Sequence, residues 1–252
     1  MSLLEVRNVS YRFADGSYGL RNISLQVSEG EFIVISGKNG SGKTVFLRTL
    51  NGLYRPTTGE IIVNGISVRE APFKARRSVG LVFQDADSQI VGQTVFRDIA
   101  FGLENLRIAR HELMTRVRRA LEMVNLEEHM HQRAHTLSGG EKRRLTIAGA
   151  VVMNPAILAL DEPFTNLDYP GVLQVLTILS RLKEHGHTII LVTHDLDKVL
   201  ALADRLVLFD NGTVVTDDRP ERAIHSAPAC GVRVAGKDTG AISIEEMTWL
   251  KD

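Results

Sequence analysis

The chain has 252 residues, and its 30 lysines and arginines balance 30 aspartates and glutamates, so the formal charge is zero. A composition of 44% hydrophobic and 24% charged residues is that of a folded globular protein and excludes a disordered or fibrous chain. The single cysteine, Cys230, excludes an internal disulfide framework and a cysteine-ligated zinc or iron–sulfur centre. Zero net charge argues against bulk nucleic-acid binding.

Neither a membrane-spanning segment nor an export signal is expected from this sequence. The longest apolar stretches, such as residues 148–153, are far shorter than the roughly 18 residues that a spanning helix needs. No segment with a basic start, an apolar middle and a small-residue end precedes Glu5. We therefore expect a soluble, cytoplasmic protein.

The first 65 residues have the pattern of strands interrupted by one helix. Apolar residues alternate over residues 4–9 and 23–27, which is typical of strands with one buried face, whereas residues 32–35 are continuously apolar, which indicates a strand covered on both faces. Glycines follow up to Gly42, and apolar residues then continue at helical spacing. A hairpin is expected at residues 59–65.

The pattern then changes twice. Between about residues 87 and 153 it is helical, with an amphipathic helix near 113–124. Strand patterns at 79–83, 157–160, 188–192 and 206–209, separated by helices, predict a mostly parallel sheet wrapped by helices. We therefore predict an α/β domain over residues 1–216, with an antiparallel β subdomain and an inserted helical subdomain at about 87–153. Beyond residue 217 the pattern fades, and 217–252 is expected to be a short extension.

A glycine-rich loop at residues 37–44 fits the pattern G-x-x-x-x-G-K-[ST]. It follows a buried strand and opens a helix, which is the placement that a phosphate-binding loop requires and a chance glycine turn does not. Its backbone amides would surround a phosphate chain, Lys43 would reach the β- and γ-phosphates, and the Thr44 hydroxyl would ligate Mg²⁺. The binding residues predicted here are Gly37, Asn39, Gly40, Ser41, Gly42, Lys43 and Thr44.

Two carboxylates follow the apolar strand at 157–160. Because Mg²⁺ prefers carboxylates together with water and phosphate oxygens, Asp161 is the predicted metal ligand. Glu162 is the predicted general base for an attacking water. Taken alone, such a pair is more often an ordinary solvated strand end, but the neighbouring phosphate loop favours the functional interpretation.

A second small-residue turn opens another helix at Ser138, Gly139 and Gly140. Exposed amides at a helix start form an anion site. One triphosphate needs only one such cradle, so two interpretations stay open. Ser138 is either a plain helix cap, or the turn binds a phosphate held by another subunit, which predicts a head-to-tail dimer.

The segment Leu-Ser-Gly-Gly-Glu begins 93 residues after Thr44 and 24 before Asp161, and it resembles the signature of ATP-binding cassette (ABC) ATPases. The resemblance extends to about residue 217. It implies a P-loop NTPase (RecA-like) fold, ATP with Mg²⁺, and a shared site in a dimer. Further roles implied by the resemblance fall on adenine-stacking Tyr11, on Gln84 beside Mg²⁺ and the attacking water, on Asp168 at the dimer interface, and on His194 at the γ-phosphate.

Residues 83–89 and 94–102 resemble a narrower group, the ATPases of energy-coupling factor importers. These importers take up cobalt, nickel, or vitamins such as biotin. In that group this segment builds the groove that receives a helix of the membrane partner. The resemblance implies a homodimer, or a heterodimer with a homologous ATPase, bound peripherally to integral membrane transport subunits at the cytoplasmic face, with no nucleic acid.

Three alternative functions stay open, and two interpretations of single clusters are set aside. A soluble ABC ATPase of DNA repair or translation, the ATPase of another importer type, and a non-catalytic nucleotide-binding scaffold are the alternatives. His129, His131 and His135 are interpreted as a polar helix end and not as a metal site. The arginines between 107 and 119 are interpreted as a solvated helix face.

Overall fold

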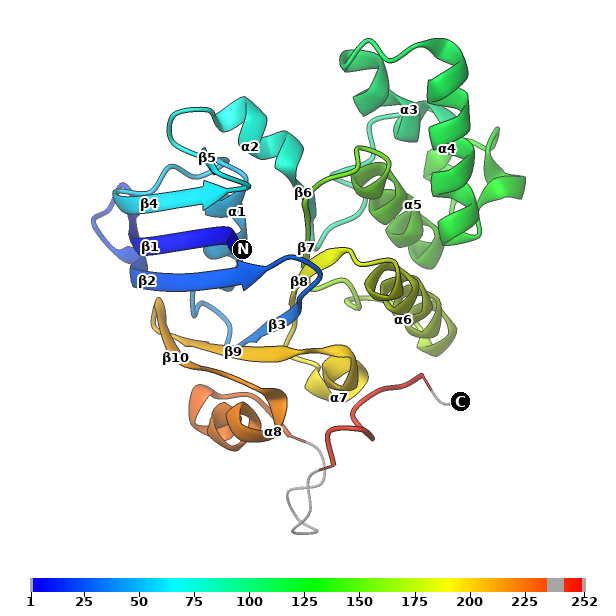
Figure 1. Cartoon of the computed structure of the whole chain (residues 1–252). Helices are drawn as coiled ribbons and strands as arrows, with labels where there is room; N and C mark the ends of the chain where they lie inside the picture. The colour runs from blue at the N-terminus through cyan, green and yellow to red at the C-terminus, as the bar shows by residue number, and fades with distance from the viewer. Residues whose placement is uncertain (1, 235–242, 251–252) are drawn as a thin grey trace.

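The computed structural model describes residues 2–234 and 243–250, which form two sheets with helices packed on them (Figure 1). The first sheet is antiparallel, in the order β2-β1-β4-β5: β2 (Tyr18–Ser28), β1 (Ser2–Arg12), β4 (Thr58–Val63) and β5 (Ile66–Ser67). The second has the order β10-β9-β3-β8-β7-β6: β10 (Thr213–Asp218), β9 (Arg205–Asp210), β3 (Phe32–Ser36), β8 (Thr188–Val192), β7 (Ile157–Asp161) and β6 (Val79–Val82).

Within the second sheet every neighbouring pair is parallel except β9 and β10. The central strands β3, β7 and β8 are buried along their whole length. They therefore appear in the sequence as continuous apolar runs, whereas β1 and β2 alternate because one of their faces is exposed. The predicted α/β fold of a mostly parallel core with an antiparallel part is confirmed.

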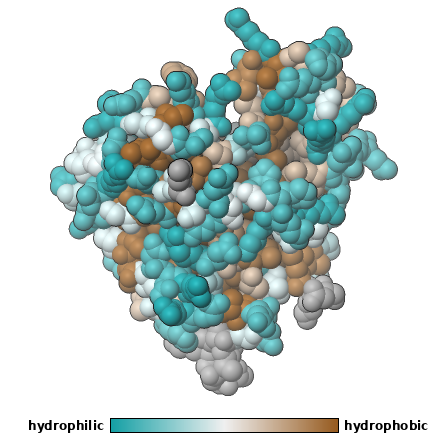
Figure 2. Space-filling view, in the orientation of Figure 1, coloured by the Kyte–Doolittle hydropathy of each residue, from teal (hydrophilic) through white to brown (hydrophobic). Residues whose placement is uncertain are grey.

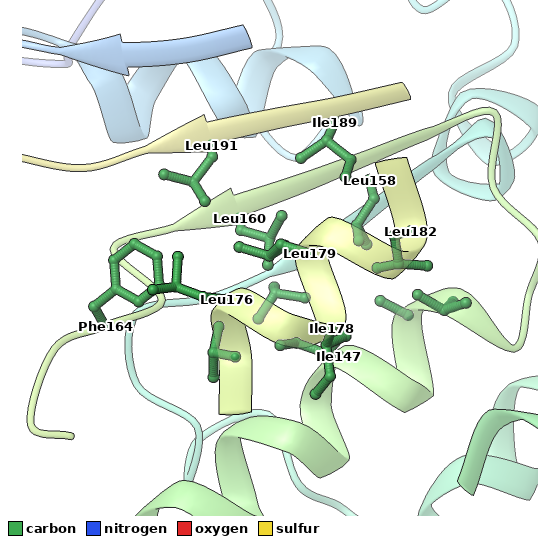
Figure 3. Close-up of a cluster of buried hydrophobic side chains, with 14 of the residues drawn as sticks. Ile147, Leu158, Leu160, Phe164, Leu176, Ile178, Leu179, Leu182, Ile189 and Leu191 are labelled. Carbon is green, nitrogen blue, oxygen red and sulfur yellow. The ribbon is translucent and has the colours of Figure 1, made fainter. Parts of the chain in front are cut away.

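Alternate residues of the parallel strands belong to two hydrophobic clusters on opposite faces of the sheet. On one face, α1 (Lys43–Leu50) packs between the two sheets. On the other face lie α6 (Tyr169–Glu184) and α5 (Gly139–Val151). Figure 3 shows the side chains of this second face, which include Leu158, Leu160, Ile189, Leu191, Leu176, Leu179 and Leu182.

Leu160 lies at the centre of this layer and is fully buried. We expect Leu160→Ala to lower the free energy of unfolding by about 2–5 kcal/mol, because the lost methyl groups leave a cavity that close-packed neighbours fill poorly. Leu53→Ala is the matched control, since Leu53 is 46% exposed. Urea unfolding measures both, and equal losses for the two variants would contradict this account of the core.

The remaining helices sit at the edges of this framework. α3 (Val95–Asn105) and α4 (Arg110–Val124) pack with α5 into a separate lobe beyond β6, shown in green in Figure 1. α2 (Pro72–Ser78) precedes β6 on the other side. The space-filling view shows hydrophobic surface both on the lobe of α3 and α4 and near α2 (Figure 2).

The expected boundary at residue 216 falls inside β10, and the chain beyond it continues on the same core. α8 (Pro220–Ala223) and the 3-10 helix η4 (Ile224–Cys230) pack onto β9, and the Lys38 amide donates to the Cys230 carbonyl at 3.0 Å. Residues 244–250 lie against α7 (Leu196–Val199), where the Trp249 amide donates to the Lys198 carbonyl. The sequence pattern faded there because short 3-10 turns have no apolar periodicity to detect.

No helix within residues 2–234 and 243–250 combines the length and the apolar character needed to cross a membrane.

Candidate functional site

The parallel strands end at one edge of the sheet, and the predicted polar residues follow those ends. β3 leads into the loop 37–44, β6 into Gln84, β7 into Asp161 and Glu162, and β8 into His194. Ligands of open α/β sheets bind at this edge. A cavity of about 380 Å³ lies there, lined by Phe13, Tyr18, Gly19, Asn39, Gly40, Ser41, Gly42, Lys43, Thr44, Val45, Gln84, Asp161, Glu162, Thr165 and His194.

The loop 37–44 curls so tightly that two of its glycines have no room for a side chain. A Cβ on Gly42, whose φ is +105°, would lie 2.5 Å from the Gly19 carbonyl oxygen. A Cβ on Gly37 would lie 2.2 Å from the carbonyl oxygen of Phe209. The loop therefore needs glycine at both positions to lie against the neighbouring backbone. Gly37 is buried beneath the loop and is not part of the cavity wall.

Lys43 is buried, with 6% of its residue surface exposed, and its side chain folds back over the loop. Its Nζ donates to the carbonyls of Gly37 at 2.7 Å and Lys38 at 3.0 Å. Burial lowers the pKa of Lys43, and the negative charges of Glu162 and Asp161 partly oppose that shift. A cation held in this way is ready to exchange neutral carbonyl acceptors for phosphate oxygens, which bind it more strongly.

Asp161 is buried at the end of β7 and is only partly satisfied. The Thr44 side chain lies close enough to Asp161 to oppose the shift of its pKa, while the Oδ1 of Asp161 has no protein partner. Burial raises the pKa of Asp161. A buried carboxylate oxygen without a donor, beside a hydroxyl, is an arrangement that a hard divalent cation fits. Gln84, from the adjacent loop, lines the same cavity and brings an amide oxygen to it.

Glu162 and His194 lie together in the wall of the same cavity. The Nδ1 of His194 lies 3.0 Å from Oε1 of Glu162, and the Glu162 amide donates to the Val192 carbonyl at 2.9 Å. Glu162 is one of the few residues other than glycine with a positive φ, +47°, and this turn directs it away from the strand. The Glu162 side chain is 12% exposed and that of His194 is 57% exposed. The pair thus presents a carboxylate that can accept a proton from a water in the cavity.

The structure places the predicted aromatic residue Tyr11 outside this cavity and a second aromatic residue, Phe13, in its wall. The Tyr11 ring stacks on Tyr54, with centroids 5.0 Å apart, and is not part of the cavity wall. Phe13 lines the cavity, is 39% exposed, and meets Tyr11 edge-on at 5.2 Å. Gly19 leaves the room that the Phe13 ring occupies, since a Cβ there would lie 3.0 Å from it. The signal that the sequence offered for Phe13 is an aromatic residue immediately after β1.

The residues 138–140 and Asp168 do not join this cavity. Ser138 caps α5 in a capping box, with its Oγ accepting from the Glu141 amide at 3.3 Å and its own amide donating to Glu141 Oε2 at 2.7 Å. Asp168 caps α6 by accepting from the Gly171 amide at 2.9 Å. The predicted cap at Ser138 is therefore present, and Ser138 and Gly139 are also exposed to solvent.

The glycines after Ser138 are not demanded by packing within the chain. A Cβ on Gly139 would meet nothing closer than the Asn166 carbonyl oxygen at 4.0 Å, and one on Gly140 only the Gly171 Cα at 3.8 Å. Neither residue has a positive φ. Small residues that the fold itself does not require leave backbone amides open to approach from outside.

A larger cavity of about 730 Å³ adjoins the first and shares four residues with it, Thr44, Gln84, Asp161 and Thr165. It is further lined by Arg48, Leu53, Tyr54, Phe83, Asp85, Ala86, Asp87, Ser88, Gly139, Lys142, Arg143, Asn166 and Leu167. Gln89 holds this region in shape, because its Oε1 accepts from the Phe83 amide and its Nε2 donates to the Leu81 carbonyl. The cavity connects the polar edge of the sheet with the first turns of α5.

Of the three histidines 129, 131 and 135, His129 contacts the start of α5. His129 Nε2 lies 3.3 Å from Oε1 of Glu141, the same carboxylate that caps α5 through Ser138. Hydrogen bonding to the Ser138 amide lowers the pKa of Glu141. His129 thus supports the capping carboxylate and hence the start of α5.

Comparison with known proteins places the chain in a well-populated group. The family model described as ABC transporter matches residues 20–165. An ABC transporter ATP-binding protein of Halobacterium salinarum is 45% identical over 92% of this chain and 99% of its own length. The cobalt import ATP-binding protein CbiO of Rhodobacter capsulatus is 42% identical, over 85% of this chain and 78% of its own. The energy-coupling factor transporter ATP-binding protein EcfA of Methanococcus maripaludis is 37% identical, over 87% and 80%.

Solved structures of the same kind superpose on the chain. CbiO1 of Clostridium perfringens, described as part of the complex CbiONQ, has a TM-score of 0.82 and 34% identity over 89% of this chain and 91% of its own. The ATP-binding cassette MJ0796, a dimer in a post-hydrolysis state with ADP and phosphate, has a TM-score of 0.76 and 29% identity over 86% and 98%.

Proposed function

The chain belongs to the ABC transporter family and is an ATPase of the importer type, and from this premise we propose that it powers an energy-coupling factor importer for a micronutrient. The observation that carries the proposal is the division of the motifs. The phosphate loop, Asp161, Glu162 and His194 meet in one cavity, while residues 138–140 lie outside it, with Ser138 and Gly139 exposed and Gly140 half-buried.

ATP would lie along the loop 37–44, with the amides of residues 39–44 and the positive end of α1 around its phosphates. Lys43 would leave the Gly37 and Lys38 carbonyls for the β- and γ-phosphates. Thr44, Asp161 and Gln84 are the residues that would hold Mg²⁺, which when bound neutralises phosphate charge. The orphaned Asp161 oxygen and the hydroxyl of Thr44 support that assignment.

Hydrolysis needs one proton acceptor, and Glu162 is placed to be it. Water attacks the γ-phosphorus, its proton passes to the Glu162 carboxylate, and the bond to the ADP oxygen breaks to release ADP and phosphate. His194, 3.0 Å from that carboxylate, orients Glu162 and reaches toward the γ-phosphate. Glu162 lines the cavity with a side chain that is 12% exposed, so its carboxylate faces the bound nucleotide and not bulk solvent.

The site is completed by a second subunit in this proposal. Ser138, Gly139 and Gly140 of that subunit would close over the γ-phosphate, with Asp168 beside the interface. The exposed position of Ser138 and Gly139, and the two glycines that packing within the chain does not require, support it. ABC ATPases dimerise and work with membrane transport subunits; here the second subunit is either a copy of this chain or a homologous ATPase. ATP shifts the pair toward closure only because it binds the closed state more tightly.

A helix of the membrane partner would bind in the 730 Å³ cavity. This cavity lies between the edge of the sheet where ATP would bind and a helical subdomain at about residues 87–153. Its lining combines apolar side chains such as Leu53 and Phe83 with the acidic Asp85 and Asp87. Through that contact the chain would be held peripherally at the cytoplasmic face of the membrane. The relatives named for cobalt import and for energy-coupling factor transport support a transition-metal ion or a vitamin such as biotin as the cargo.

Phe13 would stack on the adenine ring. Because stacking on one base contributes about 1–3 kcal/mol, we expect Phe13→Ala to weaken ATP binding by roughly 5- to 150-fold. Tyr11→Leu, which keeps an apolar side chain behind Phe13, should change the affinity by less than about threefold. Equilibrium titration with a fluorescent ATP analogue measures both. A larger loss for Tyr11→Leu than for Phe13→Ala would return the base-stacking role to Tyr11.

The proposed function is tested by purifying the tagged chain from native membranes in mild detergent and identifying its partners by mass spectrometry. We expect a hydrophobic transport subunit and one ATPase partner, with phosphate release from the complex. Asp87→Lys, which reverses one charge of the cavity rim, should weaken recovery of the membrane subunit, whereas Glu70→Lys, on an exposed turn, should not. Recovery of ribosomes or DNA repair proteins instead would favour a soluble ABC ATPase.

A further inference from the structure

One buried arginine joins the helix that begins with the exposed turn to the loop that carries Gln84. Arg143 lies in α5, five residues after Ser138, and is 3% exposed. Its Nη1 donates to the Phe83 carbonyl at 2.6 Å, and its Nη2 donates to the Gln84 carbonyl. The contact therefore spans about sixty residues of sequence and connects α5 to the end of β6.

This contact is different in kind from its neighbours in α5. Lys142 forms an ion pair with Asp87 of the same loop at 2.6 Å, but the Asp87 side chain is 70% exposed, so solvent screens that pair. Arg144 is also buried, but it donates to the carbonyls of Val124 and Asn125 at the end of α4, away from the loop. Arg143 alone among these three adjacent residues holds the Gln84 backbone from a buried position.

The chemistry of the contact requires an arginine. The carbonyls of two consecutive residues lie a few ångströms apart, and the planar guanidinium has two terminal nitrogens to serve both at once. A lysine has one nitrogen and reaches one carbonyl well. Burial lowers the pKa of Arg143, while the negative charges of Asp85 and Asp161 oppose the shift and help to keep the cation buried.

We propose that Arg143 is a positioning residue that moves Gln84 with α5, so that the turn 138–140, which completes one ATP site of the dimer, sets the position of Gln84 in the other. The inference rests on the proposed function, because it takes Gln84 and residues 138–140 to serve different nucleotides. In each subunit the exposed turn and the Gln84 loop are then joined rigidly through the first turns of α5. Binding at one site is transmitted to the second through this bond pair.

The test is a double-mutant cycle between Arg143→Met and Gln84→Ala, measured as kcat for ATP hydrolysis by the dimer. We expect Arg143→Met to lower kcat roughly 10- to 100-fold, because displacing a reacting-site group by about 1 Å has an effect of that size. Adding Gln84→Ala to Arg143→Met should lower kcat by less than about twofold more, because each change alone already removes the Gln84 side chain from its working position. The Hill coefficient for ATP should fall toward one, and Arg143→Lys should restore part of kcat.

Two further measurements distinguish displacement of the Gln84 loop from general unfolding of the variant. Amide hydrogen exchange of the nucleotide-free protein should speed up at residues 84–88 in Arg143→Met, whereas Arg144→Met should speed it up near Asn125 and leave 84–88 unchanged. ATP-analogue binding by the single subunit should stay within about twofold of the wild-type affinity. If Arg143→Met does not fold, Arg143→Gln, which is too short to reach both carbonyls, takes its place in both experiments.

Unchanged exchange at 84–88 overturns the proposal, and so does a cycle in which the two losses of kcat multiply. These outcomes differ from failure of the proposed function, which would appear as hydrolysis that is indifferent to Ser138. In that case faster exchange at 84–88 would still show the bond pair, but a Hill coefficient equal in wild type and Arg143→Met would overturn transmission between the sites.

Discussion

Glu162→Gln is expected to abolish ATP turnover while leaving ATP bound. Glutamine has the same shape and can still accept a hydrogen bond from His194, but it cannot take the proton of the attacking water. Loss of a general base lowers kcat by roughly 100- to 10,000-fold. Because ATP is then not hydrolysed, the closed dimer does not dissociate and should accumulate when ATP is present. Size-exclusion chromatography with light scattering detects this dimer.

The control for this change is Glu70→Gln, on an exposed turn outside the site, which should keep wild-type turnover and stay monomeric or dimeric as the wild type does. Single-turnover phosphate release separates loss of chemistry from slow product release. A Glu162→Gln protein that hydrolyses ATP at more than a tenth of the wild-type rate would assign the base to another group.

Ser138→Arg has the second large expected effect. Ser138 is exposed and the neighbouring Gly139 has open space around it, so the bulky side chain fits within the subunit but occupies the approach to a second one. Loss of the Ser138 cap of α5 lowers the free energy of unfolding by about 0.5–2 kcal/mol, which urea unfolding measures separately. ATP affinity of the isolated subunit should stay within about twofold, since distant sites behave independently. Hydrolysis should fall by roughly 100-fold or more, because fixed donors at the developing phosphate charge are lost.

His135→Arg provides a matched control, since it places the same charge on an exposed residue three positions upstream. It should retain most of the hydrolysis. Mixing Ser138→Arg with Lys43→Ala subunits sharpens the test, because a mixed dimer has one site with both defects and one site with neither. Recovery of activity on mixing is expected; equal activity of Ser138→Arg and wild type would exclude a shared site.

The sequence by itself determined the parallel core and the positions of the polar residues at its edge. β3, β7 and β8 are buried on both faces, so each is an unbroken apolar run whose end can be located to within a residue. Glycines of the phosphate loop are equally local, since Gly37 and Gly42 are required by the backbone that surrounds them. Because parallel strands end at a common edge, Lys43, Asp161, Glu162 and His194 could be expected to meet.

What only the tertiary structure decided depends on contacts between distant segments. Tyr11 and Phe13 are both aromatic and two residues apart, and only the packing of Tyr54 on the first and the space at Gly19 beside the second distinguish them. Arg143 sits in a run of basic residues that a helical pattern places at the surface, yet it is buried because β6 brings two carbonyl groups to it. Local periodicity contains no information on such partners, since a hydrogen bond across sixty residues depends on the fold that brings its atoms together.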